Sequence, residues 1–349
     1  MNLINCIELN NQLIKTVNKP FALYFDSDCL DSILIIVYAE SNKQDYDNIR
    51  NLITQHFTDS SMVGLVFEPK SEYPKDYSFK EELRQHIIEQ IGIDDIGYDV
   101  ETIINNRAEF ISNYLNDNKI NDVILGISGG IDSYVAGKIC QYANDKLRDI
   151  YNPIRLHLIS MPNHNQNDIK DVEDSVEDIH PYEFIDFNIG TIADIFKEKF
   201  TNICSSFNDQ HKLKYIFGNM QARVRMIGQY MFAQLYNGVV IGTDHASESL
   251  TGFYTKYGDG GTDINPLAGL RKSTIVEIAK WFNGPENVIN KKPSAGLGIS
   301  NTDEEELGVT YQDIEHFLTD GQNISDQAFN RIIHLFNRSK HKRMMPVTP

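Results

Sequence analysis

Apolar positions along the chain change their spacing repeatedly, and each change predicts a new element. Helical spacing predicts helices over 79–91 and 100–115. Apolar runs predict strands, and they lie at 123–127, 156–161, 182–189 and 238–244, with helical patterns at 168–179 and 219–236 between them. Strands that alternate with helices predict an α/β fold with a parallel sheet covered on both faces, and with ligands bound at the carboxyl ends of its strands.

A break in this pattern lies at 68–78, where "EPKSEYPKDYS" places two prolines among mixed charges. Ahead of it, "FALYF" and "MVGLVF" predict strands, "DSILIIVYA" predicts a buried strand or helix, and 45–57 has helical spacing. We therefore expect a small α+β module over 1–75 and a second domain over 76–349. The sequence leaves the module's role open between capping a surface, assisting oligomerisation and docking a partner, and a structural role is favoured.

Composition narrows the class of protein. The chain has 349 residues, 41% of them hydrophobic, which is enough for a substantial core and two domains. Asp and Glu outnumber Lys and Arg by 49 to 32, giving a net charge of -17. A nucleic-acid partner is disfavoured, because neutralising its backbone requires clustered cations. Any bound phosphate must then be held locally by backbone amides, a few cations or a metal.

Location and redox state follow from two further patterns. The amino-terminal residues lack a basic segment followed by an apolar one, and the longest apolar run, 33–39, is far shorter than the ~20 residues of a membrane span. We expect a cytoplasmic protein without a membrane segment. The cysteines at positions 6, 29, 140 and 204 are scattered, which predicts ordinary buried thiols and neither a zinc site nor disulfides.

The stretch "LGISGGIDSYVAG" at 125–137 joins the first strand of the sheet to a helix. A strand that ends in Ser-Gly-Gly and opens a helix directs several backbone N–H groups to one point, at the positive end of the helix dipole. Glycines at 129 and 130 allow an anion to approach closely, while Asp132 and Ser133 supply a carboxylate and a hydroxyl. The loop therefore predicts a site for a phosphate chain carrying Mg²⁺, although a tight packing turn is the plainer alternative.

The loop is neither a Walker A sequence nor GxGxxG; it resembles the SGGxDS loop of the N-type ATP pyrophosphatases. Later blocks resemble ammonia-dependent NAD synthetase, and the resemblance spans roughly 79–349: "GNMQARVRMIGQY" (218–230), "GTDHASESLTGFYTKYGDGGTDINPLAGLRK" (242–272), "KKPSAGL" (291–297), "ELGVTY" (306–311) and "HKR" (341–343). The resemblance implies a Rossmann-like, adenine nucleotide alpha hydrolase-like fold. It also implies the ATP-dependent amidation of deamido-NAD to NAD through an adenylated intermediate, with ammonia as donor and AMP and pyrophosphate as products.

The same resemblance assigns site residues. It implies Mg²⁺ ligands at Asp132 and Glu248, and catalytic roles for Asp132, Lys272 and Asp259, the last as a base on the ammonia side. The ATP contacts that it implies are Gly126, Ser128, Gly129, Gly130, Asp132, Ser133, Arg225, Thr243, Lys272 and Ser294. The deamido-NAD contacts are Asn219, Arg223, Lys256, Asp259, His341 and Lys342. Taken singly, Glu248 reads as a helix-terminal acid, Lys272 as a surface lysine and Asp259 as part of an Asp-Gly turn.

Some positions depart from the family pattern. Ser160 stands where an arginine often contacts ATP phosphates, Phe217 stands where a lysine is common, and Ser294 belongs to Ser-Ala-Gly where many members have Thr-Ala-Asp. On a helix, Arg223 and Arg225 point in different directions and need separate partners. The apolar residues around them, Val224, Met226, Ile227 and Met231, are expected to face the core or a partner.

Two questions of function remain at this level. The module ahead of 76 is too short for the nitrilase-like glutaminase domain of glutamine-using relatives, so free ammonia is the expected donor. The resemblance also implies a homodimer with deamido-NAD sites at its interface. The alternatives are another adenylating enzyme of the superfamily, tRNA-thiolating or GMP-forming, and a nucleotide sensor that has lost turnover. Retention of Asp132, Glu248, Asp259 and Lys272 together favours the enzyme.

Overall fold

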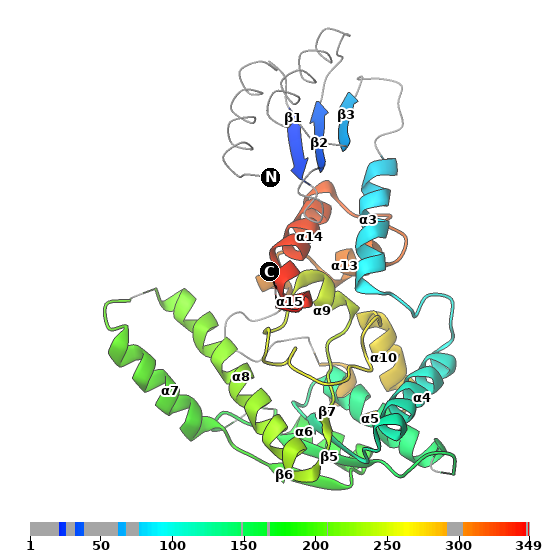
Figure 1. Ribbon diagram of the computed structural model, residues 1–349, viewed down its shortest axis with the longest axis vertical. Helices are drawn as coiled ribbons and strands as arrows, with labels where there is room; N and C mark the ends of the chain where they lie inside the picture. Colours follow the sequence, from blue (N-terminus) through cyan, green and yellow to red (C-terminus); the bar gives the residue numbers. More distant parts are fainter. Residues whose placement is uncertain are drawn as a thin grey trace. The chain divides into compact units, whose positions relative to one another are not determined.

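The computed structural model describes residues 21–25, 32–37, 62–67, 77–291 and 303–348, without 148, 166, 167, 208 and 347 (Figure 1). The chain divides into two compact units, Met1–Glu82 and Leu83–Pro349. In the first unit, β1 (Phe21–Phe25) pairs antiparallel with β2 (Ser32–Val37), which pairs parallel with β3 (Met62–Phe67). The run that the sequence left open between strand and helix is thus a strand, and the helix predicted at 45–57 lies outside the described residues.

The sheet of the second unit consists of β4 (Asp122–Gly126), β5 (Arg155–Ser160), β6 (Glu183–Asp186) and β7 (Val239–Val240). Their order is β6-β5-β4-β7 and every pair is parallel, which confirms the predicted parallel sheet. The chain crosses from β4 to β5 and β6 on one side and returns to β7 on the other. The strand order therefore reverses beside β4, and such a switch point is where open α/β sheets bind ligands.

The helices that the structure describes are α3 (Tyr77–Ile91), α4 (Val100–Asn118), α5 (Ile131–Leu147), α6 (Ile169–Ile179), α7 (Gly190–Ile203), α8 (Gln210–Tyr236), α9 (Ala246–Thr251), α10 (Lys272–Trp281), α11 (Glu286–Ile289), α12 (Asp303–Leu307), α13 (Tyr311–Leu318), α14 (Asp326–Arg338) and α15 (Lys340–Arg343). All four helices that helical spacing predicts over 76–349 are present: α3, α4 and α8 are longer than predicted, and α6 starts one residue later. Aspartate N-caps set two of the starts. Asp99 accepts a hydrogen bond from Thr102 N, and Asp209 accepts one from Lys212 N, so α8 begins well before 219.

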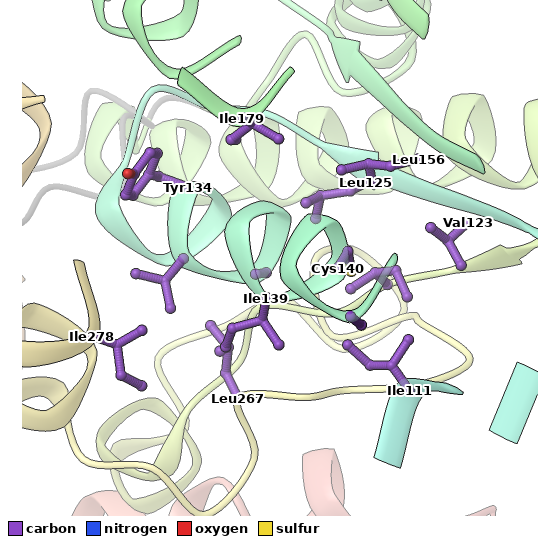
Figure 2. Packing of buried hydrophobic residues seen from close by; sticks show 14 of the residues in the cluster. Ile111, Val123, Leu125, Tyr134, Ile139, Cys140, Leu156, Ile179, Leu267 and Ile278 are labelled. Carbon is purple, nitrogen blue, oxygen red and sulfur yellow. The ribbon is translucent and has the colours of Figure 1, made fainter. Parts of the chain in front are cut away.

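The two faces of β4 belong to different apolar cores because side chains alternate along a strand. Val123 and Leu125 pack on the side of α5, where Figure 2 shows them near Cys140. Ile124 packs on the opposite side with Val224 of α8. Helices therefore cover both faces, as predicted.

The cysteine prediction holds in part. Cys140 is fully buried, and burial raises the pKa of its thiol to about 12, so it behaves as a packing group. Cys204 is only partly buried, and the expectation of a buried thiol is wrong there because it is the C-cap of α7. Cys6 and Cys29 lie outside the described residues.

Helix α8 buries only part of its apolar surface. Val224 is 5% exposed, but Ile227 and Met231 are 49% and 60% exposed, so a core-facing position is wrong for these two. Ile195 and Phe196 of the neighbouring α7 are also more than half exposed. Helices α7 and α8 lie side by side in Figure 1, and their exposed apolar residues together make up what we call the apolar surface of this pair. Among the described residues, no helix is long and apolar enough to cross a membrane.

Candidate active site

The Ser-Gly-Gly loop lies at the carboxyl end of β4 and leads directly into α5. Gly129 has a φ of +74°, a left-handed conformation that favours glycine. The Ser133 hydroxyl donates to Gly130 O (3.0 Å) and accepts from Ser128 N (3.3 Å). One hydroxyl on the first turn of α5 therefore closes the loop into a compact bend.

A cavity of about 1140 Å³ opens over this loop. The predicted site residues that line it are Gly126, Ser128, Gly130, Asp132, Ser133, Asn219, Arg225, Thr243, Glu248, Asp259, Lys272, His341 and Lys342. A single small ligand usually occupies a pocket of roughly 300–1,000 Å³. The cavity is therefore large enough for more than one substrate molecule.

Among the described residues, three predicted ones do not line this cavity: Gly129, Arg223 and Lys256. Arg223 is exposed, and its Nη2 donates to Lys256 O (3.4 Å). Lys256 itself donates to His341 O and to Met344 O. Arg225 points the other way, into the cavity, and its Nε donates to Met161 O (3.0 Å), which confirms that the two arginines need separate partners. Ser294 lies outside the described residues.

Asp132 and Lys272 form an ion pair inside the cavity. Lys272 Nζ donates to both carboxylate oxygens of Asp132, at 2.7 and 2.9 Å. Burial would raise the pKa of Asp132, but the charge of Lys272 and its hydrogen bonds outweigh burial and hold that pKa below its ordinary value. Burial would lower the pKa of Lys272, but Asp132 and Glu248 outweigh it and raise that pKa. The pair is therefore ionised.

Two further acids beside this pair, Glu248 and Asp244, are mostly buried among negative charges that nearby cations do not balance. Burial, together with Asp132 and Asp244, raises the pKa of Glu248 well above its ordinary value. Burial, Asp259 and Asp132 raise the pKa of Asp244 to about 8. Glu248 lies in the first turn of α9, where its side chain accepts from His245 N (3.3 Å). Such a set of acids has the electrostatics of a cation site.

His245 completes a set of donors suited to a metal ion. One ligand atom each from Asp132, His245 and Glu248 lies within 4.8 Å of the others. The His245 side chain is buried, and its Nε2 lies 3.6 Å from Asp132 Oδ1 and 3.5 Å from Glu248 Oε2. Burial and then Lys272 lower the pKa of His245 to about 3, so its ring is neutral. The two carboxylates can supply the oxygen ligands that Mg²⁺ prefers.

Asp259 also lines the cavity. Its Oδ1 accepts from Thr255 N (3.0 Å), and the Thr255 hydroxyl donates to Asn219 Oδ1 (2.7 Å). Burial outweighs these hydrogen bonds and raises the pKa of Asp259. The carboxylate thus belongs to a tight turn and also faces the cavity, so the two readings of this aspartate are compatible. A raised pKa suits a group that must accept a proton near neutral pH.

The basic carboxyl-terminal segment is folded onto α9. Lys342 Nζ donates to Gly252 O (2.7 Å) and Tyr254 O (2.5 Å), and Arg343 Nη1 donates to Ser249 O (2.9 Å). Cations are favoured at the end of a helix where carbonyl groups lack partners. This attachment brings His341 and Lys342 to the cavity wall.

Sequence reasoning missed two residues near the loop. His245 could have been found from its spacing of three residues before Glu248 at a helix start, which places both side chains on one face. Lys291 donates to Gly129 O (3.2 Å), and its place in "KKPSAGL" gave no sign of this contact. Two of the three departures from the family pattern lie among the described residues. Ser160 is buried at the end of β5, and the Phe217 ring packs on Phe200 of α7.

The parallel fold and the Ser-Gly-Gly loop with its acidic cluster define an ATP-binding α/β protein of the ATP pyrophosphatase class. Within that class, the family model described as NAD synthase matches residues 103–346, and the chain belongs to this family.

Relatives agree with this assignment. An NH3-dependent NAD+ synthetase from Burkholderia cenocepacia is 36% identical over 254 residues, covering 72% of this chain and 90% of that protein. One from Streptomyces coelicolor is 33% identical, covering 76% of this chain and 97% of that protein.

Two solved structures have the same fold. The NAD+ synthetase from Burkholderia pseudomallei superposes with a TM-score of 0.66 at 30% identity, covering 79% of this chain and 100% of that one. A structure described as NMN synthetase from Francisella tularensis superposes with a TM-score of 0.64 at 35% identity, covering 72% of this chain and 99% of that one.

Proposed function

We propose that the protein is an ammonia-dependent ligase that converts deamido-NAD to NAD at the cost of ATP. The observation that carries the proposal is the arrangement of the Ser-Gly-Gly loop, the Asp132–Lys272 pair and Glu248 around one cavity. Each of these belongs to a block that resembles the family in sequence. The fold then brings together residues that are more than a hundred positions apart.

The first chemical step joins two anions. A carboxylate oxygen of deamido-NAD attacks the α-phosphorus of ATP, the bond to the β-phosphate breaks, and pyrophosphate leaves with the electron pair. The loop N–H groups and Lys272 hold the phosphates during this step, and Arg225 offers its free guanidinium edge to the same charge. The transition state is favoured because these groups are fixed in place before ATP binds.

Ammonia completes the reaction at the adenylated carboxyl group. Its nitrogen attacks the carbonyl carbon, the bond to AMP breaks, and the nitrogen loses a proton. Asp259 faces the cavity, and its raised pKa fits it to accept that proton. Asn219 is held beside it through Thr255 and is assigned to deamido-NAD.

Asp132 and Glu248 are the proposed Mg²⁺ ligands. When bound, Mg²⁺ would supply positive charge that offsets the repulsion between the carboxylate and the phosphates. Metal binding would favour the ionised form of Glu248, against the burial and neighbouring negative charges that raise its pKa.

A homodimer is the proposed assembly. A dimer interface would bury exposed apolar residues of α7 and α8, and Ile227 and Met231 are strongly exposed in the single chain. Arg223 and Lys256 lie outside the cavity of the single chain. A partner packed on α8 would bring protein to these two residues, which supports their assignment to deamido-NAD at an interface. The cytoplasmic location stays a prediction of the sequence.

An assay of NAD formation tests the proposal. Purified protein receives ATP, Mg²⁺ and deamido-NAD, with ammonium in one reaction and glutamine in another, and Asp132→Ala serves as the inactive control. We expect NAD with ammonium alone and none from the variant. A parallel reaction replaces deamido-NAD by the mononucleotide acid, because one structural relative is described as an NMN synthetase. Faster turnover of the mononucleotide would replace the proposed acceptor, and ATP binding without turnover would favour the nucleotide sensor.

A further inference from the structure

Lys291 connects three segments at the edge of the cavity. Its ammonium lies 2.8 Å from Asp171 Oδ2, 3.1 Å from Asp168 Oδ2 and 3.2 Å from Gly129 O. These acceptors belong to the first turn of α6, to its N-cap and to the Ser-Gly-Gly loop. Three acceptors match the three donors of an ammonium group. Lys291 is thus fully engaged in holding the loop against α6.

The two aspartates are poorly placed for binding phosphate unless a cation accompanies them. Asp168 lines the same cavity as the loop, and it makes no side-chain hydrogen bond to cap α6. Burial would raise the pKa of Asp171, but hydrogen bonds from Lys291 and Asn287 outweigh it and keep that pKa below its ordinary value. Without Lys291, two negative charges would stand beside the site for another polyanion.

Contact between α6 and the loop is close enough for this charge balance to matter. A Cβ added at Gly129 would lie 3.0 Å from Asp171 Cβ and 3.2 Å from Asp168 O. Because a trans peptide is planar, the Gly129 carbonyl and the Gly130 N–H point in opposite directions. A carbonyl held by Lys291 therefore turns the next N–H away from Lys291, and Gly130 lines the cavity.

We propose that Lys291 is a positioning residue for ATP: it neutralises Asp168 and Asp171 and fixes the Gly129–Gly130 peptide for phosphate binding. The proposal rests on the proposed function and extends it, because Lys291 acts through the loop and the aspartates and does not have to touch the nucleotide. It makes a specific prediction. Loss of the lysine should be harmful only while the two aspartates remain charged.

Charge-matched variants test this prediction. Lys291→Met is compared with the triple variant Lys291→Met/Asp168→Asn/Asp171→Asn, with Lys291→Arg, and with Lys280→Met, an exposed lysine of α10. Binding of Mg²⁺–ATP is measured by calorimetry, and KM and kcat are measured in the NAD assay. We expect Lys291→Met to weaken ATP binding roughly tenfold, as befits two uncompensated charges near a polyanion, with a small change in the KM for deamido-NAD.

The triple variant decides between charge compensation and direct contact. Restored ATP affinity, to within about threefold of the natural chain, together with near-normal behaviour of Lys291→Arg, is the expected result. A triple variant as weak as Lys291→Met would overturn the proposal, as would unchanged affinity in Lys291→Met. Thermal unfolding identifies a variant that fails to fold. Because ATP binding is measured separately from turnover, a chain that binds ATP without making NAD would contradict the proposed function and still test Lys291.

Discussion

Lys272 donates to both carboxylate oxygens of Asp132, at 2.7 and 2.9 Å. The ammonium group therefore contacts a carboxylate that is also a proposed Mg²⁺ ligand. Both side chains are mostly buried, with 13% and 23% of their surfaces exposed. The helix that begins with Lys272 is 140 residues away from Asp132 in sequence. This pair joins α10 to the start of α5.

Replacing Lys272 by Met should damage both stability and activity. Asp132 would then be a mostly buried charge without its partner, and unfolding free energy should fall by about 3 kcal/mol. NAD formation should fall at least a hundredfold or so, because a cation aimed at the phosphates is lost. Urea unfolding and the NAD assay measure the two effects. Lys280→Met, on the exposed face of the same helix, should change neither the unfolding free energy nor NAD formation. Equal behaviour of the two variants would contradict the proposed role of Lys272.

Glu248→Gln should weaken metal binding. The amide keeps the size of the side chain but lacks the charge that an ion requires. We expect the affinity for Mn²⁺, measured by electron paramagnetic resonance as a stand-in for Mg²⁺, to fall at least about tenfold. Glu277→Gln, an exposed acid on α10, is the matched control. Chelation should also stop NAD formation, and added Mg²⁺ should restore it; undiminished Mn²⁺ affinity in Glu248→Gln would exclude this ligand.

A pH-dependent contribution to stability is expected at the amino end of β4, the end opposite the Ser-Gly-Gly loop. Asp122 accepts from Arg155 Nε (2.7 Å) and lies 2.8 Å from His157 Nε2. Burial would raise the pKa of Asp122, but these hydrogen bonds outweigh it and lower the pKa. The folded state therefore favours the ionised form, and this contribution is complete above about pH 5 and is lost as pH falls through the lowered pKa.

Asp122→Asn tests that contribution. The variant should be less stable by about 1 kcal/mol near pH 7, because Arg155 and His157 lose a charged hydrogen-bond partner while the Arg155 side chain stays partly solvated. The difference in unfolding free energy should shrink as the pH falls from about 5 toward 3, where the natural carboxylate takes up a proton. Urea unfolding across this range measures it. If the difference in unfolding free energy between the variant and the natural chain stays constant with pH, the pKa of Asp122 is not lowered in the folded state.

Gly252→Ala should disturb the carboxyl-terminal segment. Gly252 has a φ of +66°, and an added Cβ would lie 2.0 Å from Ser339 Cβ, just ahead of α15. Gly92→Ala is the matched control, since its φ is +72° and nothing lies within 4 Å of the added Cβ. Both variants carry backbone strain of about 1 kcal/mol, and only the first also displaces α15. We expect a raised KM for deamido-NAD in Gly252→Ala alone. Similar KM values in the two variants would contradict the assignment of His341 and Lys342 of α15 to deamido-NAD binding.

The dimer proposal is tested on α8. Ile227→Glu combined with Met231→Glu places two charges among the exposed apolar residues of α8, which should dissociate an assembly held there. Light scattering after size-exclusion chromatography should show a dimer for the natural chain and a monomer for the variant. Ile96→Glu, at a residue that is 53% exposed outside the apolar surface of α7 and α8, is the control. If the natural chain has the mass of a monomer in this measurement, the dimer proposal is wrong.

Local patterns were enough to predict much of the fold. The apolar runs at 123–127 and 156–161 became the parallel strands β4 and β5, and the helical spacing at 168–179 became α6. The period of apolar residues along the chain shows which face of a strand or helix is buried. Boundaries were less certain. Helix α8 begins at Gln210 because Asp209 caps it, which periodicity alone does not reveal.

What the sequence determined by itself is the class of the chain and the identity of its Ser-Gly-Gly loop. Neighbouring residues fix such a loop, since Ser128, Gly129 and Ser133 build it from one short stretch. Tertiary structure alone decided that Lys272 meets Asp132, that His245 faces two acids and that Lys291 holds the loop. The energy of each of these contacts depends on burial and on charges contributed by distant segments, and neither quantity can be read from a residue's sequence neighbours.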